Sequence, residues 1–318
     1  MRAPAFLCSA PRDTPLSIQC HPNHAQARAG FARENRRGLP PDAPERNYRD
    51  PNHKPELLVA LTRFLALKGF RPVEEQLRLL CPLKLASLEG PLDVLGRMQD
   101  EDALRRLFAR LLTMGPDERG SLLEQAIAAA AASRDGDPAY AWVLRLAEKH
   151  PGDVGAIAPL LLNLIELEPD EGLYLPAGEL HSYLEGTALE IMANSDNVLR
   201  GGLTPKHVDV EELLAIASFR SGPAEVLRPE PRRPGETVYR TPAREFELGL
   251  VRVKSNCPHD SVPDRGVELW LGLEGDATFL AEGRSFSLAR GRSLFVPAAV
   301  ERYRVEGEGR ACRAGLPL

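Results

Sequence analysis

The chain has 318 residues, of which 43% are hydrophobic and 27% charged. This composition excludes wholesale disorder, and the length predicts roughly two domains with a sizeable core. With 40 basic and 45 acidic residues the net charge is −5, whereas a dedicated nucleic-acid binder needs a basic surface. We find neither an apolar run of about 18 residues nor a secretory signal. We therefore expect a cytoplasmic protein that binds neither nucleic acid nor a membrane, with its five scattered cysteines reduced.

The first predicted element is a short strand over residues 15–20, where polar and apolar side chains alternate. A polar amphipathic helix over residues 24–36 follows, and a loop rich in proline and aspartate continues it over residues 40–55. Residues 56–62 fit a strand or a helix by pattern alone. Pro55 on one side and the Gly-Phe-Arg-Pro break at 69–72 on the other favour strands.

In the next part of the chain the apolar residues recur with the period of a helix. Leu104, Leu107, Phe108 and Leu111 lie on one helix face. Similar spacing before and after them predicts a block of about four helices over residues 73–167.

Strand signals return after this block. Residues 172–181 read as a strand, a turn and a second strand, and Asp209 opens a capping box before a short helix over 210–217. A stretch rich in proline and arginine, residues 222–235, is the best candidate for a linker. From residue 237 onward, short alternating runs separated by Gly-containing turns predict a small β-barrel or sandwich.

Two segments resemble each other within the chain. Residues 173–181 and 294–302 both have an apolar strand, then Pro-Ala and a small residue, then a second strand. The first copy ends in His181 and the second in Arg302, which cannot bind a metal. The match predicts two related barrels, one with a metal-capable position and one without; a chance match is the alternative.

Four side chains are candidates for one metal site. Gln19 and His21 are two residues apart on a predicted strand, so both leave the same face. Lys54 and Glu56 have the same spacing, and His181 begins a third strand. Two imidazoles with amide and carboxylate oxygens suit zinc. The alternative is that these are ordinary surface or hydrogen-bonding histidines.

A polar, loop-like run over residues 190–206 contains charges of both signs and two adjacent glycines. Arg200 and Lys206 suit a phosphate, because a guanidinium offers a bidentate fork and an ammonium a point charge. The alternative is a solvated turn in which Gly201 and Gly202 adopt positive φ.

Four segments in this order resemble one known family. They are SIQCHP at residues 17–22, DPNHKPEL at 50–57, PAGELH at 176–181 and SDNVLRGGLTPK at 195–206. Together they look like type I mannose-6-phosphate isomerase (phosphomannose isomerase), of the cupin superfamily. The helical block between the second and third segments also agrees with that family.

The resemblance implies one zinc ion per chain and a pocket for a small sugar phosphate. The implied zinc ligands are Gln19, His21, Glu56 and His181. The implied pocket residues are Arg200 and Lys54, with catalytic roles, and Ser17, Glu190, Asp196 and Lys206, which bind substrate. The implied reaction interconverts mannose 6-phosphate and fructose 6-phosphate through a cis-enediol, which needs a base and a cation beside the developing oxyanion. Neither the base nor the oligomeric state is assigned at this point.

The implied fold is mainly β with an inserted helical block: two cupin-like β-barrels or jelly rolls plus an α-helical domain. Residues 1–72 and 168–221 are expected to form the metal-binding barrel, 73–167 the helical insert, and 222–318 a C-terminal cupin-like domain without metal ligands. Members of the family carry a substantial segment before the SIQCHP motif. We do not expect residues 1–14 to supply its strands, so the first barrel is predicted to lack N-terminal strands.

Two other functions stay open. The chain can be a non-catalytic or inactive truncated cupin that binds a sugar phosphate, or nothing, because the missing strands open the barrel. It can also be a metal-dependent oxygenase on the same scaffold, since such iron sites commonly use two histidines and one carboxylate.

Overall fold

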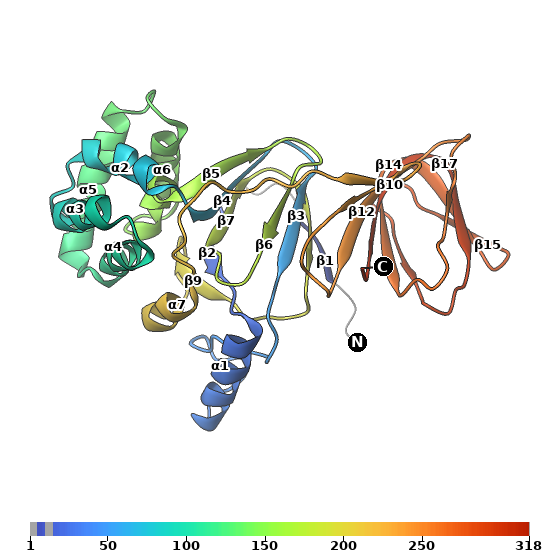
Figure 1. Ribbon diagram of the computed structural model, residues 1–318, viewed down its shortest axis with the longest axis horizontal. Helices are drawn as coiled ribbons and strands as arrows, with labels where there is room; N and C mark the ends of the chain where they lie inside the picture. Colours follow the sequence, from blue (N-terminus) through green and yellow to red (C-terminus); the bar gives the residue numbers. More distant parts are fainter. Residues whose placement is uncertain (1–4, 10–14, 318) are drawn as a thin grey trace.

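A computed structural model describes residues 5–9 and 15–317 (Figure 1). The chain has a mixed α/β fold in which a block of helices lies at one end of the molecule and the C-terminal strands lie at the other (Figure 1). Between them lie two further sheets, formed by strands from before and after the helical block. Among the described residues, no helix combines the length and the apolar character that crossing a membrane requires.

Two antiparallel sheets form the middle of the molecule. The first sheet has the order β1 (Ala5–Ser9), β8 (Ala188–Met192), β3 (Glu56–Ala60) and β6 (Gly172–Leu175). The second sheet has the order β5 (Leu162–Leu167), β4 (Phe64–Phe70), β7 (His181–Glu185), β2 (Ile18–Cys20) and β9 (Leu199–Gly202). The strands predicted between Pro55 and the break at 69–72 are therefore confirmed as β3 and β4, which belong to different sheets.

The first sheet is covered on both faces, which explains why every residue of β3 is buried. Leu58 packs with Ala66 and Tyr183 in a core between the first and second sheets. On the opposite face of β3, Leu57 belongs to a core that includes Phe246 of the C-terminal region. Strands buried on both faces read as continuous apolar runs, which is why the sequence of β3 was compatible with either a strand or a helix.

The helical block packs on the outer face of the second sheet. It contains α2 (Val73–Leu80), α3 (Glu89–Met98), α4 (Glu101–Thr113), α5 (Pro116–Ala132) and α6 (Pro138–Lys149). Leu104, Leu107, Phe108 and Leu111 are all buried in one core with strand residues such as Leu67, as the spacing predicts. The predicted end of the block at residue 167 is wrong, because residues 162–167 form β5 and pair with β4.

Two isolated helices were also predicted. Helix α1 (His24–Arg36) has the predicted bounds and begins with a capping box formed by Asn23 and Gln26. Helix α7 (Val210–Ile216) begins after Asp209, whose side chain accepts a hydrogen bond from the backbone N–H of Glu212.

The C-terminal region forms a third sheet. Its main path is β10 (Glu230–Arg233), β11 (Glu236–Tyr239), β12 (Glu247–Val253), β17 (Tyr303–Gly315), β14 (Glu268–Ala281) and β15 (Arg284–Ser287). Strand β13 (His259–Asp260) pairs with β17, and β16 (Ser293–Val296) pairs with β14. The all-β expectation for this region is confirmed. The predicted linker is only partly correct, since its last residues form β10 and pair with β11.

A strand precedes the first predicted one. Residues 5–9 form β1, which pairs with β8 antiparallel over five residues. The expectation that the segment before residue 15 supplies no strand is therefore wrong; residues 1–4 and 10–14 lie outside the described part. A five-residue strand close to prolines carries too little pattern to be predicted, and here the partner strand provides the backbone hydrogen bonds that define it.

Candidate metal centre

A row of polar residues crosses the second sheet at one level. Gln19 in β2 lies directly opposite His181 in β7 on one side and Arg200 in β9 on the other. Residues paired in this way on antiparallel strands share a face of the sheet, and His21 shares it too because it follows Gln19 by two positions. The face is the one that packs on the first sheet, since Tyr183, two positions after His181, lies in the core between the two sheets.

The carboxylate that meets these histidines comes from the first sheet. Glu56 is the first residue of β3, and its side chain is buried. Its Oε1 lies 3.2 Å from Nε2 of His21, and its Oε2 lies 3.5 Å from Nε2 of His181. The three donor atoms all lie within 4.8 Å of one another. Residues far apart in the sequence thus converge in one buried cluster between two sheets.

Both imidazoles are oriented by backbone carbonyls. Nδ1 of His21 donates to the carbonyl oxygen of Asn197 at 2.8 Å, and Nδ1 of His181 donates to that of Glu179 at 3.0 Å. These bonds leave the lone pair of each Nε2 aimed toward Glu56, which is how second-shell groups commonly prepare histidine ligands. Nε2 of His21 is buried and has no hydrogen-bond partner. The cluster therefore fits a divalent cation, which would occupy the lone pairs that the protein leaves unused.

The charges of the cluster support this assignment. Burial alone would raise the pKa of Glu56, but His21 and His181 hold it well below its ordinary value. Burial lowers the pKa of His21. Nζ of Lys54 lies 3.2 Å from Oε1 of Glu56, so this carboxylate also has a basic neighbour. Burial alone would lower the pKa of His181, but its contact with Glu56 raises it. A metal binds an ionised carboxylate and neutral imidazoles, so a cation here would displace the proton that Glu56 favours on His181.

A second acid lies next to the cluster. Glu190 is on β8 and accepts a hydrogen bond of 2.7 Å from the hydroxyl of Tyr183. Burial and the nearby charge of Glu56 raise the pKa of Glu190 to about 7. A carboxyl group with this pKa can gain or lose a proton near neutral pH.

The other candidate substrate residues lie at different depths. Ser17, Lys54 and Arg200 are partly buried, whereas Asp196 and Lys206 are exposed. Burial lowers the pKa of Arg200. The register of β2 with β9 brings Arg200 close to Gln19.

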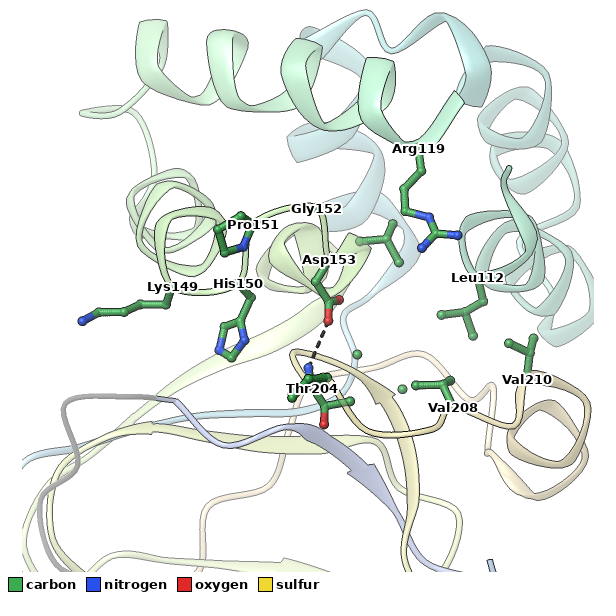
Figure 2. Close-up of a pocket in the computed structure, with 14 residues that line it drawn as sticks. Leu112, Arg119, Lys149, His150, Pro151, Gly152, Asp153, Thr204, Val208 and Val210 are labelled. Carbon is green, nitrogen blue, oxygen red and sulfur yellow. Dashed lines mark hydrogen bonds between the residues drawn. The ribbon is translucent and has the colours of Figure 1, made fainter. Parts of the chain in front are cut away.

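The loop that carries Lys206 also contacts the helical block. The carboxylate of Asp153 accepts a hydrogen bond of 3.0 Å from the backbone N–H of Thr204, which Figure 2 shows as a dashed line. This contact lies at a cavity of about 650 Å³ lined also by Arg119 and His150. The residues around this cavity include none of the candidate zinc or substrate residues. Asp153 therefore ties the loop to the helices on the side of the sheet away from the metal cluster.

One supporting residue was not singled out from the sequence. Asn197 is fully buried, and its side-chain amide donates to the carbonyl oxygens of Asp50 and Asn52, both at 2.8 Å. It thereby connects the loop before Glu56 to the segment whose carbonyl holds His21. The only signal in the sequence was its place inside the SDNVLR segment.

The comparisons with known proteins agree with this site. Residues 10–73 match the family model described as phosphomannose isomerase type I, catalytic domain. The mannose-6-phosphate isomerase of Escherichia coli (strain K12) is 40% identical over 308 residues, which are 96% of this chain and 76% of the relative. This chain belongs to the type I phosphomannose isomerase family. Another member, mannose-6-phosphate isomerase 1 of Arabidopsis thaliana, is 32% identical over 317 residues, covering 95% of this chain and 71% of its own.

Solved structures of the family have the same fold. A zinc-bound mannose 6-phosphate isomerase superposes with a TM-score of 0.89 and 37% sequence identity, covering 98% of this chain and 78% of that one. A mutant phosphomannose isomerase from Salmonella typhimurium gives the same TM-score, identity and coverage. The resemblance stated from four sequence segments is therefore confirmed over nearly the whole chain.

Proposed function

We propose that Gln19, His21, Glu56 and His181 hold a zinc ion in this chain, which acts as a mannose-6-phosphate isomerase. The observation that carries the proposal is the buried convergence of His21, Glu56 and His181, whose donor atoms lie within 4.8 Å of one another. Two imidazoles and a carboxylate are a frequent zinc set in catalytic sites, where a further position stays open to water or substrate. A zinc-bound relative with the same fold supports the choice of metal.

Gln19 is proposed as the fourth ligand because of its register. It lies opposite His181 and two positions before His21, so its amide leaves the sheet on the face that holds both imidazoles. A neutral oxygen ligand leaves the zinc set with one negative charge, from Glu56. The centre would therefore retain net positive charge toward a sugar oxygen.

The proposed reaction interconverts mannose 6-phosphate and fructose 6-phosphate through a cis-enediol. The chain has to remove a proton from one carbon, return it to the next, and stabilise negative charge on oxygen meanwhile. A bound zinc ion would supply a positive charge that polarises the sugar oxygens. Arg200 is proposed to stabilise the developing oxyanion, because it lies beside Gln19 on the same sheet face.

Lys54 and Glu190 are proposed to handle protons close to the centre. Lys54 has its ammonium 3.2 Å from Glu56, where it can donate to a sugar oxygen and balance the buried carboxylate. Glu190 has a pKa of about 7, which suits a group that must exchange protons at neutral pH. Ser17, Asp196 and Lys206 are proposed to bind the hydroxyl and phosphate groups of the sugar.

The sheets support a division into two cupin-like units with a helical insert. Because β5 pairs with β4 in the second sheet, the proposed metal-binding unit is 1–72 with 162–221, the insert is 73–161, and the C-terminal unit is 222–318. Two sheets facing each other around a buried metal cluster are what a jelly-roll architecture would provide. In the C-terminal unit Arg302 stands at the position that His181 has in the resembling segment 173–181, and it is exposed. This agrees with a C-terminal unit that has no metal ligand at that position.

The experiment is metal analysis of the purified chain together with a coupled assay of fructose 6-phosphate formation from mannose 6-phosphate. We expect one tightly held zinc ion and turnover that a chelator abolishes and zinc restores. Zinc-loaded, folded protein without turnover would instead identify a non-catalytic binder of sugar phosphate. Rescue by ferrous iron but not by zinc would contradict the zinc assignment.

A further inference from the structure

A second cluster of metal-capable side chains lies apart from the zinc centre. His24 begins α1, His53 lies in the loop before β3, and Glu245 lies between β11 and β12 of the C-terminal region. Nε2 of His53 lies 2.7 Å from Oε1 of Glu245, and the ring centroids of His24 and His53 are 3.7 Å apart. One donor atom from each of the three residues lies within 4.8 Å of the other two.

The backbone of each residue is held in place by other contacts. His24 follows Asn23, whose capping box with Gln26 begins α1. His53 follows Asn52, whose carbonyl oxygen accepts hydrogen bonds from Ser195 and Asn197. These anchors fix the backbone on which the two stacked imidazoles stand.

Glu245 is anchored in the same way from the C-terminal region. The next residue, Phe246, is fully buried in the core beneath the first sheet. Oε2 of Glu245 accepts a hydrogen bond of 3.0 Å from the backbone N–H of Arg244, which leaves Oε1 facing His53. Preorganised donors of this kind lower the cost of forming a metal site.

The charges at the cluster suit a cation. Burial and the neighbouring His53 lower the pKa of His24, so its imidazole is neutral at neutral pH. Burial alone would raise the pKa of Glu245, but its contact with His53 holds it below the ordinary value. Arg28 lies one turn further along α1, and its positive charge opposes the binding of a cation at the cluster. The carboxylate of Glu245 offsets that charge.

We infer that His24, His53 and Glu245 form a second divalent-cation site, of the zinc class and weaker than the buried centre. Two imidazoles with one carboxylate are the donors that zinc and similar transition metals prefer, and partial exposure leaves a position for water. The site shares no ligand with the centre formed by His21, Glu56 and His181. A bound cation would join α1 and the loop before β3 to the C-terminal region.

The test is zinc binding by equilibrium dialysis of the full-length protein, with cobalt as a spectroscopic probe. We expect a second equivalent of zinc to bind the parent protein at higher free zinc, and cobalt to give d–d absorption bands in two steps. His24→Ala and Glu245→Gln should each weaken the second equivalent at least tenfold and leave the first in place. His207→Ala, which removes an exposed histidine elsewhere, should leave both equivalents.

Glu56→Ala separates the two sites. It should weaken the first equivalent and leave binding at His24, His53 and Glu245, so failure of the buried centre is distinguishable from failure of this one. A parent protein that binds one equivalent across the zinc range would overturn the inference. So would an unchanged second equivalent in Glu245→Gln, because the cluster would then be only a hydrogen-bonded pair beside a stacked ring.

Discussion

Gln19 lies directly opposite His181 where β2 pairs with β7. Through this pairing, a segment near the start of the chain meets one that follows the helical block 162 positions later. Because Glu56 reaches the same point from the facing sheet, the candidate centre depends on both sheets being packed correctly. The packing of the sheets and the geometry of the site are therefore linked, and the predictions below separate them.

Glu56→Ala should lose metal, because it removes the one anionic ligand and leaves two imidazoles without a partner. We expect zinc affinity to fall by more than about 100-fold, together with turnover. The measurement is zinc content after dialysis against a weak chelator. Equal zinc content in the variant and the parent protein would refute the ligand assignment.

Arg200→Lys should keep the metal and reduce kcat by about 10- to 100-fold. The charge is retained, but an ammonium cannot reproduce the planar fork of a guanidinium beside the reacting oxygens. Steady-state kinetics and zinc content are measured on the same preparation. Unchanged kinetics would contradict the proposed role of Arg200.

Asn197→Ala should weaken zinc binding although Asn197 is not itself a ligand. The variant removes the amide donor from the partly buried carbonyls of Asp50 and Asn52, of which the second keeps its hydrogen bond from Ser195, at a cost of about 1–3 kcal/mol in unfolding free energy. The loss of support for His21 should reduce zinc affinity by about 10- to 100-fold. Asn194→Ala, at an exposed position nearby, is the matched control. If both variants bind zinc like the parent protein, Asn197 does not position the site.

Arg313→Met should destabilise the C-terminal region. The buried guanidinium of Arg313 contacts Glu236 at 2.8 Å, Glu247 at 3.1 Å and Glu268 at 3.1 Å. Its removal leaves three buried carboxylates short of positive charge, at a cost of about 3–5 kcal/mol. Urea unfolding at pH 7 measures the loss. A variant as stable as the parent protein would show that Arg232, Arg233 and Arg265 suffice to balance these carboxylates.

His259 should make stability depend on pH. Burial first, and then Arg233, lower the pKa of His259 to about 3, so the folded state holds this imidazole neutral while the unfolded chain protonates near pH 6.5. The contribution of neutral His259 to the free energy of unfolding is complete above pH 6.5. Below that pH it falls by about 1.4 kcal/mol per pH unit, down to about pH 3. His259→Gln should remove this part of the slope. Unfolding curves at pH 7 and pH 5 test it, and identical slopes in both proteins would contradict it.

Local pattern was sufficient for many elements. The capping box at Asp209 and the spacing of Leu104, Leu107 and Phe108 predicted helices that the structure contains. The i, i+2 spacing of Gln19 and His21 predicted a shared strand face. The strand β1 and the strand at 162–167 were missed, because short strands are defined by their partners and not by their own residues.

The sequence by itself determined which side chains are available: two imidazoles, a carboxylate, and a motif order that resembles one family. Only the tertiary structure decided that Nε2 of His21 and of His181 both face Glu56. The carbonyl oxygen of Asn197 orients His21 in this way, and that of Glu179 orients His181. It also brought Glu245 to His24 and His53, which no spacing in the chain suggests. The physical reason is that strand pairing and sheet packing bring together residues more than 100 positions apart. The periodicity of a sequence indicates only which side chains share a face of the same helix or strand.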